Sequence, residues 1–143
     1  MSGEVAKAWN APVGNGTVQY GPAKVEDDRP FTATQLTRID EALTLSSRES
    51  GLTFSVYVGQ LSAPARAHAE ALFEKLTDDS VLLAISPGQR NLHIVTGSGS
   101  ANRLPNRACA LAALAMRASF TNGDLTGGIV TGLRMLADAA GHA

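Results

Sequence analysis

The five consecutive apolar residues from Val81 to Ile85 constrain the fold of this chain more than any other feature of its sequence. A strand that is apolar on both faces must be covered on both faces, so helices are expected above and below it. Residues 52–58 alternate apolar and polar side chains and predict a second strand, and Pro64 lies in the first turn of a helix between the two. Strand, helix and strand in this order predict a right-handed parallel crossover unit.

The segment after the central strand predicts that the sheet is mixed. Pro87 and Gly88 mark a turn. Leu92, Ile94 and Thr96 follow it with strand spacing, and such a short connection allows only an antiparallel return. The sequence therefore predicts an α/β fold with a small mixed β-sheet.

Three helical segments surround these strands. Thr32 and Gln35 have the spacing of a capping box, and they predict a helix over residues 33–50. Residues 108–116 contain only Ala, Leu, Cys and Met, which predicts a helix buried nearly all round. The last helix is expected to start at Asp124 as its N-cap.

Residues 1–30 differ in composition from the rest of the chain. They are rich in Gly, Pro, Asn and Asp, and we expect them to form a flexible N-terminal arm. Val18 and Tyr20 alternate with polar neighbours, so an edge strand in this arm is the alternative. The remaining residues, 31–140, are expected to form one α/β domain, which a chain of 143 residues accommodates.

Charge and cysteine content exclude several classes of protein. Twelve basic and thirteen acidic residues give a net charge of −1 without a basic cluster, so a nucleic-acid partner is not expected. No apolar run approaches the ~18 residues of a membrane span, and the first residues lack the apolar core of a signal peptide. We therefore expect no membrane insertion and a cytoplasmic location. Cys109 is the single cysteine, and its apolar helix predicts a raised thiol pKa and a packing role.

The order of these segments resembles the TPM domain family, which is known from thylakoid-lumen photosystem repair proteins and many bacterial relatives. The likeness covers residues 31–137 and is greatest to the uncharacterised actinobacterial branch of that family. The segments that carry it are, in family order, FTATQLTRIDEAL, GLTFSVYVG, AEALFEKLTDDSVLLAIS, RNLHIVTGSG, RLPN and FTNGDLTGGI.

The resemblance implies a three-layer α/β/α sandwich and says less about activity. Some family members are reported as weak acid phosphatases that bind divalent cations, and others serve the assembly or repair of membrane complexes. The chain departs from the family at two positions. Asn106 stands where the family usually has the aspartate of an LPD motif, and Leu125 stands where an aromatic residue usually follows GD.

One end of the predicted sheet brings together candidate metal ligands. The start of the second parallel strand and the exit of the antiparallel strand share an end, which places Asp78 and Asp79 near the loop Gly97, Ser98, Gly99, Ser100 and near Asn106. Carboxylates beside backbone carbonyls are oxygen ligands suited to Ca²⁺ or Mg²⁺. The alternative is a solvated turn. The loop itself has the context of a phosphate cradle, but it lacks the third glycine of a dinucleotide fingerprint and the lysine of a P-loop. A flexible connector is therefore favoured.

The carboxyl ends of the parallel strands form a reserve ligand site, because α/β sheets usually bind ligands there. Its candidate residues are Gly59, Gln60, Ser62, Ser86, Gln89, Arg90 and Asp124. No acid and base pair converges among them by sequence. His68, His93 and His142 lack metal-ligand spacing and are expected to be surface or packing residues.

These observations support three hypotheses about function. The leading one is an uncharacterised, non-catalytic TPM-like module that acts through an unidentified protein partner, because no acid, base and nucleophile converge and Asn106 lacks a carboxylate. The second is a weak divalent-metal-dependent phosphatase that uses Asp78 and Asp79. The third is a small-ligand binding domain at the carboxyl end of the parallel pair. The sequence establishes no cofactor, and Ca²⁺ or Mg²⁺ is the one that the phosphatase hypothesis would require.

Overall fold

The computed structural model describes residues 11–13, 16–20 and 31–141. Its sheet has five strands in the order β1-β2-β3-β4-β5. They are β1 (Ala11–Val13), β2 (Gly16–Tyr20), β3 (Thr53–Val58), β4 (Ser80–Ser86) and β5 (Asn91–Thr96). The three middle strands are parallel to one another, and β1 and β5 pair antiparallel at the two edges. The predicted mixed sheet is confirmed.

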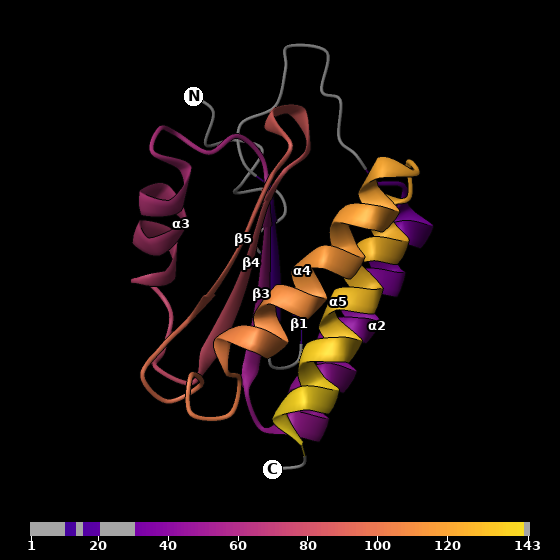
Figure 1. The fold of residues 1–143 in the computed structure, drawn as a ribbon. Helices are drawn as coiled ribbons and strands as arrows, with labels where there is room; N and C mark the ends of the chain where they lie inside the picture. Colours follow the sequence, from indigo (N-terminus) through magenta and orange to yellow (C-terminus); the bar gives the residue numbers. More distant parts are fainter. Residues whose placement is uncertain (1–10, 14–15, 21–30, 142–143) are drawn as a thin grey trace.

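Helices cover both faces of this sheet, as Figure 1 shows. One face carries α2 (Ala33–Ser50), α4 (Asn106–Thr121) and α5 (Leu125–Ala140), and the other carries α3 (Ala65–Phe73). A short 3-10 turn, η1 (Pro87–Gln89), joins β4 to β5. The three-layer α/β/α sandwich is confirmed.

The central position of β4 follows from its composition. All of its residues are buried. Val81, Leu83 and Ile85 belong to the large core beneath α2, α4 and α5, whereas Leu82 and Ala84 belong to a smaller core with Ala69 of α3. Alternate side chains of one strand thus bind the two helical layers together.

The ends of α2 are fixed by local hydrogen bonds. Thr32 Oγ1 accepts from the backbone N–H of Gln35 at 3.1 Å, and Gln35 Oε1 accepts from the backbone N–H of Thr32 at 2.9 Å. At the other end Gly51 adopts a left-handed φ of 78°, which glycine accepts without steric cost. The predicted bounds and capping box of this helix are confirmed.

Part of the predicted arm belongs to the sheet. Residues 11–13 and 16–20 are strands, so the expectation of a flexible arm is wrong for them; the rest of residues 1–30 lies outside the described residues. The physical reason is that β3 has a free edge, and β2 pairs with it in parallel from Thr17 opposite Ser55 to Tyr20 opposite Val58. The alternative expectation of a strand at Val18 and Tyr20 is confirmed, although β1 rather than β2 forms the edge.

The expectation that residues 108–116 are buried nearly all round is wrong. Ala112 and Met116 of α4 are fully buried, but the side chains of Leu111 and Leu114 are 51% and 65% exposed. The reason is that α4 packs against α5 on one side and against β5 beneath it, and it lies at the margin of the helical layer (Figure 1). Within the described ranges, every helix falls short, in length or in apolar character, of what a membrane crossing requires.

Candidate functional site

The two ends of the sheet hold the polar residues that the sequence singles out. We call the end with Asp78, Asp79, the loop 97–100 and Asn106 the aspartate end. We call the opposite end, at the carboxyl terminus of β4, the arginine end; it comprises the β4–β5 turn with Arg90, the last turns of α4 with Arg117, and the start of α5.

The predicted proximity of Asp78 to the loop 97–100 is confirmed. The backbone N–H groups of Gly99 and Ser100 donate to the carbonyl oxygen of Asp78 at 3.0 and 3.1 Å. The carbonyl of Asp79 in turn accepts from Thr53 N–H at 3.1 Å. The start of β4 and the exit of β5 are therefore joined through backbone groups.

The loop 97–100 is a fixed connector rather than a flexible one. Ser100 is fully buried, and its hydroxyl donates to the carbonyl of Ser80 at 2.7 Å and accepts from Gly97 N–H at 2.9 Å. A Cβ on Gly97 would lie 2.5 Å from the carbonyl oxygen of Asp78, so only glycine fits this approach. A phosphate cradle needs free backbone N–H groups, and those of Gly97, Gly99 and Ser100 already have partners.

The carboxylates at the aspartate end are exposed and only partly engaged. Asp79 Oδ1 accepts from the hydroxyl of Thr77 at 2.5 Å. Asn106, at the start of α4, is exposed and makes no hydrogen bond with Asp78 or Asp79 within the described part of the chain. No group of three or more His, Cys, Asp or Glu side chains in the described part of the chain is arranged to hold a metal ion. Ca²⁺ takes 6–8 oxygen ligands, of which these residues supply a part. The metal site stays a prediction.

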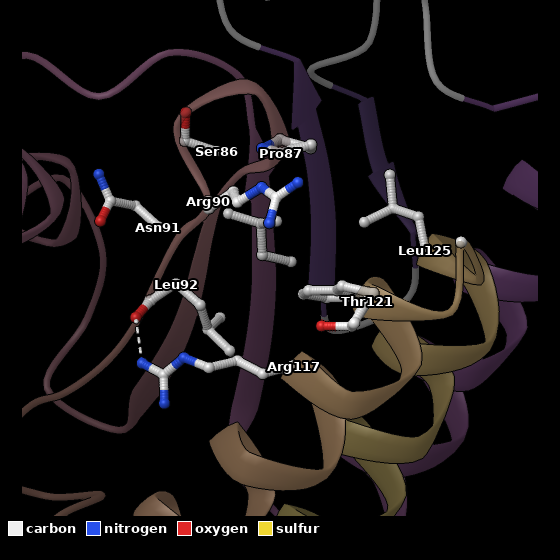
Figure 2. Close-up of a pocket in the computed structure, with 11 residues that line it drawn as sticks. Ser86, Pro87, Arg90, Asn91, Leu92, Arg117, Thr121 and Leu125 are labelled. Atoms are coloured by element: carbon white, nitrogen blue, oxygen red, sulfur yellow. Dashed lines mark hydrogen bonds between the residues drawn. The ribbon is translucent and has the colours of Figure 1, made fainter.

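A cavity of about 400 Å³ opens at the arginine end. Figure 2 shows that it lies between the β4–β5 turn and the junction of α4 with α5. Its lining combines two arginines with polar and apolar residues: Ile85, Ser86, Pro87, Arg90, Asn91, Leu92, Arg117, Phe120, Thr121, Gly123 and Leu125. The described lining thus contains Ser86 and Arg90 of the reserve site that the sequence predicts.

Other predicted residues of the reserve site hold the turn in place. Gln89 Oε1 accepts from Leu61 N–H at 2.9 Å and from the Ser86 hydroxyl at 2.5 Å, and Gln89 Nε2 donates to the carbonyl of Leu61 at 3.1 Å. Gln60 accepts through its carbonyl from the Tyr57 hydroxyl at 2.9 Å. Because the Ser86 hydroxyl donates to an amide oxygen rather than to a base, it is not arranged as a nucleophile.

Asp124 is part of a helix cap. Its carboxylate accepts from the backbone N–H of Gly127 at 2.8 Å, as the sequence predicts for the N-cap of α5. The backbone N–H of Ser62 donates to His68 Nδ1 at 2.7 Å, which gives that histidine a structural role.

The remaining ionisable candidates lie along β5 and α4. Burial lowers the pKa of His93, and the positive charges of Arg66 and Arg117 lower it further. Its Nε2 atom is buried and has no hydrogen-bond partner among the residues that the structure describes, which fits a neutral ring. Burial raises the pKa of the Cys109 thiol, so the prediction of an unreactive packing cysteine is supported.

Comparison with known proteins assigns the family. Residues 15–137 match the model of a domain of unknown function, DUF5130. The chain belongs to this family. The match covers β2 and all the elements that follow it as far as α5.

Relatives of this DUF5130 chain occur in Mycobacterium tuberculosis. It is 33% identical over 117 residues to the uncharacterized proteins MT2543 of strain CDC 1551 and Rv2468c of strain H37Rv, covering 80% of this chain and 70% of each relative. The family that the sequence resembles, TPM, is not the one that this comparison names; DUF5130 is the family shown.

Two solved bacterial structures share the fold. One is the N-terminal domain of a protein from P. gingivalis, with a TM-score of 0.69 and 16% identity, covering 96% of this chain and 85% of the other. The second is BA42 from Bizionia argentinensis, with a TM-score of 0.68 and 17% identity, covering 82% and 84%. At these identities the likeness concerns the fold alone.

Arg117 is the functional candidate that the sequence does not reveal in this DUF5130 chain. It lies on α4, is exposed, and donates from Nη2 to the carbonyl of Leu92 on the edge strand at 3.5 Å. One signal was available: Arg117 is the only charged residue between Ala108 and Gly123. That isolation from other charges does not indicate which loop the side chain reaches, because the contact depends on how α4 lies against β5.

Proposed function

We propose that this DUF5130 protein is a non-catalytic module that acts by binding a partner protein on the outer face of α4. The observation that carries the proposal is the exposure of Leu111 and Leu114, two leucines one helical turn apart. Ala110 and Ala118 are exposed on the same side of the helix. Contiguous apolar surface of this kind is typical of interaction sites, whereas isolated exposed apolar residues are not.

The positive charges around this face indicate what kind of partner would bind there. We define the α4 face as Ala110, Leu111, Leu114 and Ala118, with Arg107 and Arg117 towards its two ends. The whole of α4 lacks an acidic residue. The occupant that complements this face is an amphipathic helix of another protein, with apolar side chains between acidic residues spaced ~15 Å apart, the rise of ten helical residues.

The polar groups of the domain support the absence of catalysis. The hydroxyl of Ser86 donates to Gln89, and the carboxylate of Asp79 accepts from Thr77. The described lining of the cavity contains no Asp, Glu, His, Lys or Cys. A hydrolytic site needs a nucleophile and a base within hydrogen-bond reach of each other, and neither end supplies such a pair among the described residues.

The proposal also places DUF5130 as a branch of the TPM domain family. The support is the order of the matching segments. FTATQLTRIDEAL forms the capped helix α2, GLTFSVYVG forms β3, and the segments that follow supply β4, β5 and the start of α5 in an α/β/α sandwich.

Photo-crosslinking tests the proposed docking face. A photo-reactive amino acid at position 114 is expected to capture one partner in cells, and the same residue at exposed position 75, beyond α3, is not. With that partner purified, Leu114→Ser is expected to weaken binding about tenfold, the size of a moderate hot spot. Leu45→Ser is the matched control, because Leu45 is 54% exposed but lies on α2. Equal losses for both variants contradict the proposal, and capture of a second copy of this chain overturns the choice of occupant.

A divalent-metal-dependent phosphatase is the second candidate. The observation in its favour is that Asp78 and Asp79 are exposed beside the loop 97–100. Hydrolysis of p-nitrophenyl phosphate is measured with Mg²⁺, Ca²⁺ or Mn²⁺ and with chelator, for the wild type and for Asp79→Asn. Hydrolysis that needs both the metal and Asp79 would establish the phosphatase and refute the non-catalytic module.

A further inference from the structure

The cavity at the arginine end is lined by Arg90 and apolar residues that are not part of the α4 face. Among the described residues that line it, two are arginines and none is acidic. The nearest carboxylate in sequence, Asp124, caps α5 through Gly127 N–H. Positive charge therefore borders this opening without a compensating negative group in its described lining.

Arg90 supplies the better placed of the two charges. Its guanidinium makes no hydrogen bond or ion pair with any residue that the structure describes. In Figure 2 this group lies in the space between the β4–β5 turn and Leu125. A free guanidinium offers five N–H donors in a fork that fits a carboxylate or a phosphate.

The backbone conformation of Arg90 also supports a binding role for this residue. Its φ of 55° is the only positive φ of a non-glycine residue in the described part of the chain. Glycine or asparagine suits such a position better than arginine. Residues in conformationally unfavourable backbone regions cluster at binding sites, which favours a binding role for the side chain of Arg90.

Arg117 borders the cavity from the other side. Figure 2 shows its side chain extending from α4 to the edge of β5. Its one hydrogen bond to the described residues, from Nη2 to the Leu92 carbonyl, is long at 3.5 Å. The remaining N–H groups leave Arg117 able to add positive potential and a second donor.

The rest of the lining fits an apolar body. Ile85 and Leu92 are buried, and Phe120 and Leu125 are half-buried at the cavity. The volume of about 400 Å³ lies within the usual size of small-molecule sites. Figure 2 shows the Asn91 side chain turned away from α4, so arginine and apolar groups dominate the opening.

We propose that this cavity binds a small organic anion, with its carboxylate or phosphate group on Arg90 and its apolar body against Leu92, Phe120 and Leu125. Arg117 strengthens binding from the opposite rim. The ligand of this site lies at the end of the sheet, and Arg117 is the residue that the cavity shares with the α4 face.

Four matched probes test the site on the full chain by amide chemical-shift titration. 3-Phenylpropionate and phenyl phosphate carry an anion on a ring, 3-phenyl-1-propanol lacks the anion, and acetate lacks the ring. We expect one or both ring-bearing anions to shift amides of residues 85–92 and 117–125, and to bind about tenfold more tightly than the alcohol or acetate. If 3-phenylpropionate binds more tightly, the site prefers a carboxylate; if phenyl phosphate binds more tightly, it prefers a phosphate.

Substitutions assign the roles of the arginines. Arg90→Asn removes the guanidinium with a residue that accepts the left-handed region, and it is expected to weaken the preferred anion about tenfold. Arg117→Gln is expected to cause a smaller loss. Arg107→Gln, at the far end of α4, is the matched control and should leave the affinity unchanged.

Three results overturn the inference. Binding of the alcohol that is as tight as that of the better ring-bearing anion would make the cavity purely apolar and remove the role of the charge. Unaltered binding to the folded Arg90→Asn variant would remove Arg90 from the site. An absence of shifts with all four probes at millimolar concentration would remove the site itself.

Discussion

The two ends of the sheet use their polar groups in opposite ways. At the aspartate end, the carbonyl of Asp78 accepts two backbone hydrogen bonds and the hydroxyl of Ser100 bridges Gly97 and Ser80. At the arginine end, Arg90 has no side-chain partner among the described residues and Arg117 has one long hydrogen bond. The comparison teaches that the backbone groups of a glycine-rich loop can be used to hold two strands together rather than to bind a ligand.

The cause of the difference lies in how closely the backbone segments approach. The loop after β5 crosses directly over the start of β4, so that Gly97 and Asp78 are in backbone contact. No space remains there for a ligand between the two segments. At the opposite end, η1 and the α4–α5 junction diverge and leave a cavity of about 400 Å³.

Gly97→Ala tests the close contact at the aspartate end and has the largest expected effect. The new Cβ would lie 2.5 Å from the carbonyl oxygen of Asp78 and 2.9 Å from Cζ of Phe73. Backbone cannot yield as a flexible side chain does, so we expect a loss of about 2–3 kcal/mol in the free energy of unfolding. Urea denaturation of the purified variant measures it.

Gly88→Ala is the control at the arginine end. A Cβ at Gly88 meets nothing within 4 Å, so the change is expected to stay within about 0.5 kcal/mol. If both alanine variants lose the same stability, the two ends are packed alike and the comparison fails.

Arg90→Gly tests the arginine end, where we expect a smaller change in the free energy of unfolding, and of opposite sign, than for Gly97→Ala. Glycine accepts the φ of 55° that arginine adopts there. We expect the free energy of unfolding to rise by about 0.5–1 kcal/mol, because relief of the left-handed conformation exceeds the extra entropy of the unfolded chain. The same variant should lose affinity for the ring-bearing anions. Denaturation and titration of one sample measure both, and a fall in stability would show that Arg90 holds the turn.

Much of this fold could be predicted from local sequence signals. The capping box of Thr32 and Gln35 determined the start of α2, and the run Val81 to Ile85 identified the central strand. Chain direction then placed Asp78 near Gly99. Each of these three predictions depends on residues that are close in sequence or on one short connection. A local sequence pattern is sufficient to predict such features.

The rest depended on contacts that the sequence does not record. Residues 16–20 are too polar for a clear strand pattern, and the free edge of β3 recruits them. The apolar segment around Leu114 predicts a buried helix, but Leu114 is exposed because α4 lies at the margin of its layer. The sequence does not reveal that position. The cavity arises from three separate segments, so Arg117 could not be assigned to it in advance.

The smallest predicted effect tests how far the positive potential of the arginine end reaches along β5. Burial, Arg66 and Arg117 lower the pKa of His93, whereas Glu70 raises it. We expect Arg117→Gln to move the pKa of His93 part of the way back towards 6.5, with burial and Arg66 still holding it below that value. Titration of the ring protons by NMR measures the shift, and Arg107→Gln is the control on the same helix.

The same shift determines how stability depends on pH. Because the folded pKa of His93 lies below its ordinary 6.5, the unfolded chain binds more protons as pH falls from about 6.5 to the folded value. The contribution of His93 is thus fully present above pH ~6.5 and is lost below it. Arg117→Gln should make this loss shallower than in the wild type in urea denaturation at successive pH values. An unchanged slope together with an unchanged His93 pKa would confine the influence of Arg117 to the cavity.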